Sequence, residues 1–83
     1  MKNKVLVELI VPSLDEIYNI YLPINKKIGN IIQLLNKSLC DLTNGLFIPS
    51  DTNFLYDNQG ERYDINLLVR ETNIRNGSSI VLF

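Results

Sequence analysis

The sequence predicts an α+β domain in which one helix covers one face of a mixed β-sheet. Two apolar, β-branched stretches near the start are separated by a short turn, which is typical of an antiparallel hairpin. A single stretch with helical periodicity follows. The sequence then closes on a third apolar stretch, residues 79–83, after the turn signal Asn76-Gly77. We expect the element order ββαβββ within a single domain spanning residues 1–83, a length that suits one hydrophobic core.

The first two strands are predicted from period-two alternation. Over residues 4–11, one face of the strand carries the core-forming set Val5, Val7, Leu9 and Val11, and the other face carries Lys4, Leu6, Glu8 and Ile10. Pro12 and the Ser-Leu-Asp-Glu that follows end this strand in a turn. Residues 17–22 return as the second strand, with Ile20 and Leu22 inward and Asn19 and Tyr21 outward.

The helix is predicted from a change of period after Pro23, from two residues to about 3.6. Its apolar stripe consists of Ile28, Ile31, Ile32, Leu35 and Leu39. Asn25 is a candidate N-cap, because its side chain can accept a hydrogen bond from a first-turn amide. Gly29, inside the helix, should cost about 1 kcal/mol relative to alanine.

The second half of the chain has weaker patterns. Its elements are expected in this order: a long connection over residues 41–53, with 46–48 as a short strand or a buried anchor; a short strand at 54–56; a turn at 57–60; a returning strand at 62–65; a one-turn segment at 67–69; and the last strand.

Composition and charge exclude several classes of function. Lys and Arg number 8 against 9 Asp and Glu, so the basic footprint of a nucleic-acid-binding protein is absent. The apolar run near the start contains Glu8 and is far shorter than the roughly 20 residues of a membrane span, so we expect no direct membrane insertion. One cysteine, Cys40, allows no internal disulfide and fits a reducing compartment. A cytoplasmic location is therefore expected.

Candidate reactive groups are few. With no histidine in the chain to activate it, Cys40 is expected to be a small apolar residue and not a nucleophile. Asp57, Glu61 and Asp64 surround one turn, but they lack the tight spacing of a cation-binding loop and are expected to be turn residues. There is no triad, Walker loop or zinc signature. We expect no enzyme activity, no catalytic residues, no cofactor and no metal.

Two segments carry a resemblance to a known family. Residues 18–32, Tyr-Asn-Ile-Tyr-Leu-Pro-Ile-Asn-Lys-Lys-Ile-Gly-Asn-Ile-Ile, and residues 69–80, Val-Arg-Glu-Thr-Asn-Ile-Arg-Asn-Gly-Ser-Ser-Ile, resemble the YukD/EsaB family of bacterial ubiquitin-like proteins associated with type VII (ESX-like) secretion. Asn73 stands where that family often has Gly, and Ser78 where it often has Asp. Asn also tolerates the left-handed conformation, so we expect the backbone there to be kept.

The resemblance implies a β-grasp fold and a non-conjugating adaptor that binds proteins, among them cytoplasmic parts of a secretion machinery. The sequence ends at Phe83 with no Gly-Gly tail, which agrees with a domain that is not conjugated. Two alternatives stay open: a sulfur-carrier-type β-grasp protein that lacks its Gly-Gly tail, and a ubiquitin-like domain cut from a larger membrane protein.

A protein-binding patch is predicted on the sheet face turned away from the helix. If Ile80 and Leu82 face the core, Val81 and Phe83 face outward. The resemblance implies recognition by this face together with the first turn, which gives the predicted patch Leu6, Leu14, Leu55, Val81 and Phe83. The alternative is a set of scattered surface hydrophobic residues. A homodimer through the same face is a further alternative.

Overall fold

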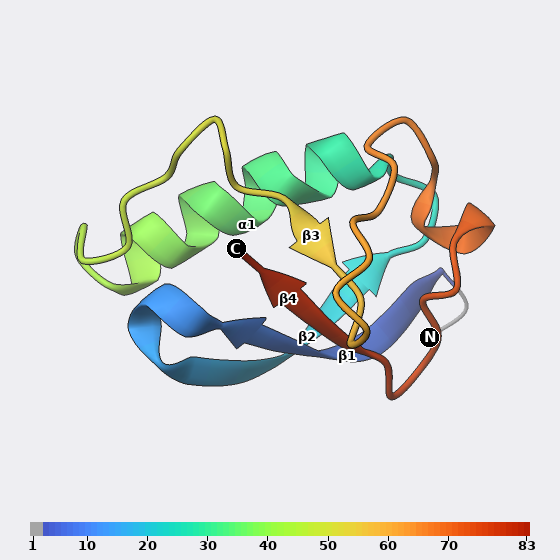
Figure 1. Ribbon diagram of the computed structural model, residues 1–83, viewed down its shortest axis with the longest axis horizontal. Helices are drawn as coiled ribbons and strands as arrows, with labels where there is room; N and C mark the ends of the chain where they lie inside the picture. The colour runs from blue at the N-terminus through green and yellow to red at the C-terminus, as the bar shows by residue number, and fades with distance from the viewer. Residues whose placement is uncertain (1–2) are drawn as a thin grey trace.

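One helix lies across one face of a four-stranded sheet in the computed structural model, which describes residues 3–83 (Figure 1). The elements follow in the order β1 (Lys4–Val11), η1 (Pro12–Leu14), β2 (Glu16–Pro23), α1 (Ile28–Leu42), β3 (Leu55–Tyr56), η2 (Val69–Glu71) and β4 (Ser79–Leu82). This arrangement confirms the predicted α+β class, with one helix packed on a mixed sheet.

The sheet has the strand order β2-β1-β4-β3. β1 is antiparallel to β2, with Val7 opposite Ile20, and parallel to β4, with Leu9 opposite Ile80. The two chain-terminal strands thus lie side by side at the centre. The hairpin between β1 and β2 turns tightly, because Asp15 adopts the left-handed conformation at φ 53°. The predicted hairpin is confirmed.

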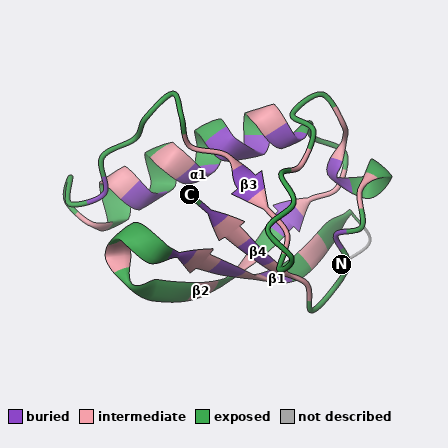
Figure 2. Cartoon of the chain, viewed as in Figure 1, coloured by how far each residue is buried: buried purple, intermediate pink, exposed green. Residues whose placement is uncertain are grey.

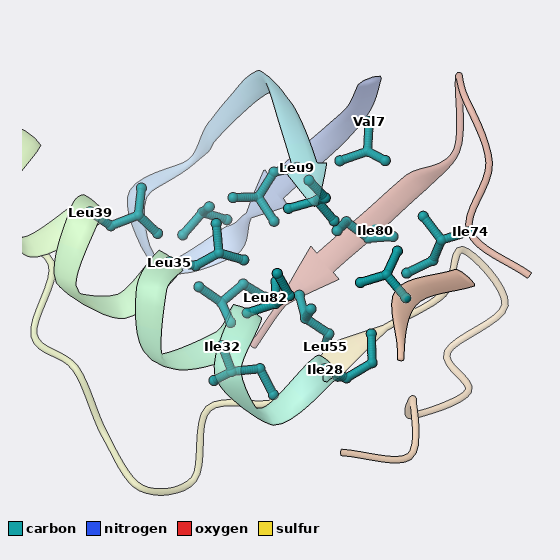
Figure 3. Packing of buried hydrophobic residues seen from close by; sticks show 14 of the residues in the cluster. Val7, Leu9, Ile28, Ile32, Leu35, Leu39, Leu55, Ile74, Ile80 and Leu82 are labelled. Atoms are coloured by element: carbon teal, nitrogen blue, oxygen red, sulfur yellow. The ribbon is translucent and has the colours of Figure 1, made fainter. Parts of the chain in front are cut away.

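The core lies between α1 and the inner face of the sheet (Figures 2 and 3). The predicted helical stripe is entirely buried, and so are three of the four inward residues of β1; Val5, the fourth, packs against the core at its margin. The connection after α1 contributes Phe47, which is 4% exposed, while its neighbours Leu46 and Ile48 are 75% and 80% exposed. Residues 46–48 are therefore a buried anchor and not a short strand.

The predicted strand at residues 62–65 is wrong. Only one isolated bridge forms there, between Tyr56 and Arg62. The backbone beyond it serves another element: the carbonyls of Ile65 and Leu67 accept hydrogen bonds from the amides of Gly29 and Ile28 at 3.0 and 2.8 Å. From Ile65 onward the backbone thus bonds to the start of α1 and no longer to β3. The order is ββαββ, with the 3₁₀ turn η2 after β3.

The same contacts overturn the predicted N-cap. The cap position of α1 is Lys27, which makes no side-chain cap hydrogen bond. Asn25 is not needed, because the first two amides of the helix already have backbone acceptors in residues 65–67. Side-chain capping is thus replaced by a contact between segments far apart in the sequence.

The turn before β4 is hydrogen-bonded to the edge of β1 that faces away from β2. Gly77 has φ +88°, which glycine adopts without steric cost. The Leu6 amide donates to Asn76 Oδ1 at 2.8 Å, and the Leu6 carbonyl accepts from the Gly77 amide at 2.8 Å. The predicted turn is confirmed.

The expectation for Asn73 is wrong, because the non-glycine residues with positive φ in residues 3–83 are Asp15 and Asn44. The Asn73 side chain accepts a hydrogen bond from the Tyr63 hydroxyl at 2.8 Å instead. Within residues 3–83, no helix has both the length and the apolar character needed to cross a membrane.

Candidate protein-binding face

The outer face of the sheet, turned away from α1, is built from alternate residues of the four strands. Residues that pair across strands share a face. Leu6, Glu8 and Ile10 of β1 therefore stand beside Tyr21, Asn19 and Ile17 of β2, respectively. The outer face is thus divided into rows that run across the strands.

An apolar row crosses all four strands at one end of this face. Ile10 pairs with Ile17 on one side and with Val81 on the other, and Val81 pairs with Tyr56. The Phe83 ring meets the Tyr56 ring edge to face, with centroids 6.4 Å apart and an angle of 70° between the planes. We call these five residues the outer row: Ile10, Ile17, Tyr56, Val81 and Phe83.

The outer row is accessible to a partner. Ile17 and Phe83 are 59% and 68% exposed, and Ile10, Tyr56 and Val81 are half-buried. A shallow hollow of about 350 Å³ lies over four of the five residues and is bordered by the turn at Asp57. Contiguous exposed apolar side chains beside a hollow are typical of a protein-binding surface.

A polar row separates the outer row from the other end of the face. It consists of Asn19, Glu8 and Ser79, and the Ser79 hydroxyl donates to Glu8 Oε1 at 3.0 Å. Beyond it lie Leu6 and Tyr21, which are 39% and 53% exposed. The outer face therefore has two apolar ends, of which the outer row is the larger.

The structure brings together only two of the five predicted patch residues. Val81 and Phe83 do face outward in the same row. Leu6 also faces outward but lies beyond the polar row. Leu14 is half-buried in η1 and packs against the core.

The prediction for Leu55 is wrong, because its side chain is fully buried (Figure 3). Leu55 pairs with Leu82, and paired residues share a face, so the two leucines point into the core together. Its neighbour Tyr56 takes the outward position. A shift of one residue in β3 exchanges the two faces.

Sequence reasoning missed Ile10, Ile17 and Tyr56 as members of the patch. The signal for two of them is present in the first hairpin, where alternation already puts Ile10 and Ile17 on the outward face. The cross-strand register needed to join them to Val81 is set by the parallel pairing of β1 with β4, which no local pattern specifies.

The carboxylates near residue 60 bond to backbone amides. Asp57 Oδ1 accepts from the amides of Gln59 and Glu61 at 2.8 and 2.9 Å, and Asp64 Oδ1 accepts from the Asn66 amide at 2.9 Å. These are turn-stabilising bonds. In the described part of the chain, no group of His, Cys, Asp or Glu is arranged to hold a metal ion. Cys40 is a half-buried free thiol at the end of α1.

The architecture is the ubiquitin-like β-grasp fold, as comparison with solved structures shows. No protein-family profile and no curated protein sequence matches the chain. The EccD5 ubiquitin-like domain from Mycobacterium xenopi superposes with a TM-score of 0.78 at 17% identity, over 96% of this chain and 92% of that chain. The ubiquitin-like domain of the Mycobacterium tuberculosis type VII secretion protein EccD1 gives a TM-score of 0.75 at 10% identity, over 95% and 96%.

A third similar structure is a chain of the MycP5-free ESX-5 inner membrane complex, with a TM-score of 0.72 at 13% identity. The match covers 98% of this chain but only 21% of that chain. Ubiquitin-like proteins from other systems superpose as well. At these identities the likeness establishes the fold, which many functions share.

Proposed function

We propose that this domain is a non-conjugating ubiquitin-like adaptor that binds a protein partner through the outer row, as an accessory of a type VII (ESX-like) secretion system. The observation that carries the proposal is the continuous apolar row over all four strands, with Phe83 and Ile17 as its most exposed members. Because the row is rimmed by the polar Glu8–Ser79 pair, it has the apolar centre and polar border of a typical interface.

Two comparisons support the secretion assignment. Both EccD ubiquitin-like domains superpose over nearly their whole length. The segments that resemble the YukD/EsaB family are residues 18–32 and 69–80. The first forms most of β2 and the first turn of α1, and the second runs from η2 into β4. We infer a cytoplasmic partner from the same machinery.

The test is capture of purified cytoplasmic domains of the secretion ATPase and the membrane subunits on immobilised protein. Wild type should retain at least one of them, and Phe83→Asp should lose about tenfold or more in affinity, because a charge placed in an apolar contact must be desolvated. Leu46→Asp is the matched control, since Leu46 is also exposed but lies in the connection after α1. Failure of wild type to bind any of these domains, or equal binding by Phe83→Asp, contradicts the proposal.

A second candidate is a ubiquitin-like domain of a larger membrane protein. The observation that favours it is the ESX-5 inner membrane complex, in which the matching domain makes up 21% of the chain. The size of the native polypeptide in cells, measured by immunoblot, separates the two candidates. A band much larger than 9.5 kDa supports the second candidate over a free-standing adaptor.

A further inference from the structure

β2 is an edge strand, because it stands first in the sheet order and pairs only with β1 among the described residues. The Ile24 amide donates to the Asn3 carbonyl, on the β1 side, at 2.9 Å. Backbone groups of a strand alternate in direction, so the amides and carbonyls of Ile17, Asn19 and Tyr21 point away from β1. These groups are free to pair with another strand.

This edge lacks the usual protection against strand pairing. Natural edge strands are commonly blocked by charged side chains or bulges. No residue from Ile17 to Ile24 is charged, and β2 extends over eight residues in unbroken register with β1. Proline occurs only at Pro23, the last residue of the strand.

An apolar groove runs beside the same edge, between β2 and α1. It is a hollow of about 280 Å³ lined by residues that include Ile20, Leu22, Leu34 and Leu35. Leu34 is 53% exposed although it faces this groove. One partner can therefore pair with the free backbone groups of β2 and also contact the apolar groove.

We propose that a second copy of this chain occupies the edge, with the two β2 strands antiparallel about a two-fold axis at Asn19. This register is self-complementary on the outer face. It sets Ile17 opposite Tyr21 of the second copy, both of them apolar and more than half exposed, and it sets the two Asn19 amides opposite each other. Pairs of aromatic and β-branched residues are favourable neighbours across antiparallel strands.

Charge selects the antiparallel orientation. The start of β2 is acidic, with Asp15 and Glu16. Its other end is basic, because Lys4 pairs with Pro23 and the chain continues into Lys26 and Lys27. Antiparallel pairing brings the acidic end of one copy to the basic end of the other, whereas parallel pairing brings like charges together. The net charge of −1 adds little overall repulsion.

The dimer forms one continuous sheet of eight strands with both helices on the same side. The two grooves then face each other, so Leu34 and Ile20 of each copy are covered. The outer face lengthens as well, because the outer row of one copy ends at Ile17, beside Tyr21 of the other. The dimer goes beyond the proposed adaptor function, and its interface shares only Ile17 with the outer row.

The test uses one position on the symmetry axis. In sedimentation velocity across a concentration series, wild type should form dimers, and Asn19→Lys and Asn19→Asp should each weaken the dimer by about tenfold or more, because like charges meet across the axis. An equimolar mixture of the two variants should restore the dimer as a heterodimer. Asn19→Thr, an uncharged residue that favours strands, is the matched control and should dimerise like wild type.

Both charged variants should remain folded, because Asn19 is exposed. A lysine there faces Glu8 across the hairpin, and an aspartate facing Glu8 should cost no more than about 1 kcal/mol. Circular dichroism of each variant checks this. A wild type that stays monomeric up to its solubility limit overturns the proposal, and so does a dimer that both charged variants leave intact. Phe83→Asp should still dimerise, so loss of partner binding and loss of the dimer are separate results.

Discussion

Leu55 lies on β3 and Phe83 directly follows the neighbouring strand β4, but their side chains have opposite environments. Leu55 is fully buried beside Leu82, whereas the Phe83 ring is 68% exposed and touches Tyr56 at the surface. Three apolar residues in a row, Phe54-Leu55-Tyr56, carry no alternation, so the sequence could not say which of them faces inward. For this reason the predicted patch contained the wrong member of the strand.

Truncation to alanine should lower the free energy of unfolding much more at Leu55 than at Phe83. Leu55→Ala removes a buried side chain and should lower the free energy of unfolding by about 2–5 kcal/mol. Phe83→Ala should lower it by less than about 1 kcal/mol, because most of the ring is already in water. Urea denaturation followed by circular dichroism measures both. Equal losses would show that the assignment of faces in β3 and β4 is wrong.

The domain should lose stability at alkaline pH as the Tyr63 hydroxyl ionises. Burial, and then the nearby Asp57 carboxylate, raise the pKa of the Tyr63 hydroxyl above 10.0. The native state thus holds the phenolic proton more tightly than the unfolded chain does. The stabilisation is complete below pH 10.0 and is lost as the pH rises through the native pKa.

Tyr63→Phe tests this alkaline dependence. The variant lacks the hydrogen bond to Asn73 and should lose about 0.5–1.5 kcal/mol at neutral pH. Between about pH 10 and about pH 11, however, its free energy of unfolding should fall less steeply than that of wild type. Parallel curves for the two proteins over this range, measured by urea denaturation, would contradict the assignment.

At the scale of elements, the local patterns predicted β1, β2, α1 and β4 because each has a clear period and lies against the core. The strand proposed at 62–65 and the Asn25 cap failed together, for one physical reason. Residues 65–67 bond to the first amides of α1, across more than thirty residues of sequence, and no local propensity reports such a contact. The outer row was recovered only in part, because its register depends on the non-local pairing of β1 with β4.

Gly29 is the residue on which this contact with α1 depends. Its amide donates to the Ile65 carbonyl at 3.0 Å, and a Cβ added at position 29 would lie 3.3 Å from the Ile65 oxygen. Alanine normally stabilises a helix by about 1 kcal/mol relative to glycine. Here Gly29→Ala should give no gain and a small net loss, because the carbonyl must retreat from the new methyl group.

Thermal and urea unfolding of Gly29→Ala measure the balance. Gly45→Ala is a useful contrast, because Gly45 has open space around it but a φ of +82°, so its loss should come from backbone strain alone. A gain near 1 kcal/mol for Gly29→Ala would mean that residues 65–67 move freely and do not fix the start of the helix.

At the scale of the whole molecule, the sheet is held together by contact between residues far apart in the chain. β1 pairs in parallel with β4, and the Glu8 amide donates to the Ser78 carbonyl at 2.9 Å. Phe83 and Phe54 then exchange two backbone hydrogen bonds of 3.0 Å, which fix β3 to β4. β4 thus joins β1 to β3 and supplies Ile80 and Leu82 to the core.

Removal of residues 79–83 should therefore abolish cooperative folding and not merely weaken one edge. The truncation removes the buried side chains of Ile80 and Leu82. It also removes the only strand partner that β3 has among the described residues. Loss of amide dispersion in the NMR spectrum and of a sigmoidal urea transition is the expected result. A truncated chain that still unfolds cooperatively would show that β1, β2 and α1 form an independent unit.

β1 pairs with β4, which is translated about seventy residues later. The sheet therefore cannot be completed strand by strand as the chain is translated. The β1–β2 hairpin and α1 can form as they leave the ribosome. The other edge of β1 has no strand partner until the segment near residue 80 has emerged. Long-range closure of this kind slows folding relative to helical proteins of the same size. Until that segment has emerged, a newborn chain carries a central strand that is paired on one side only.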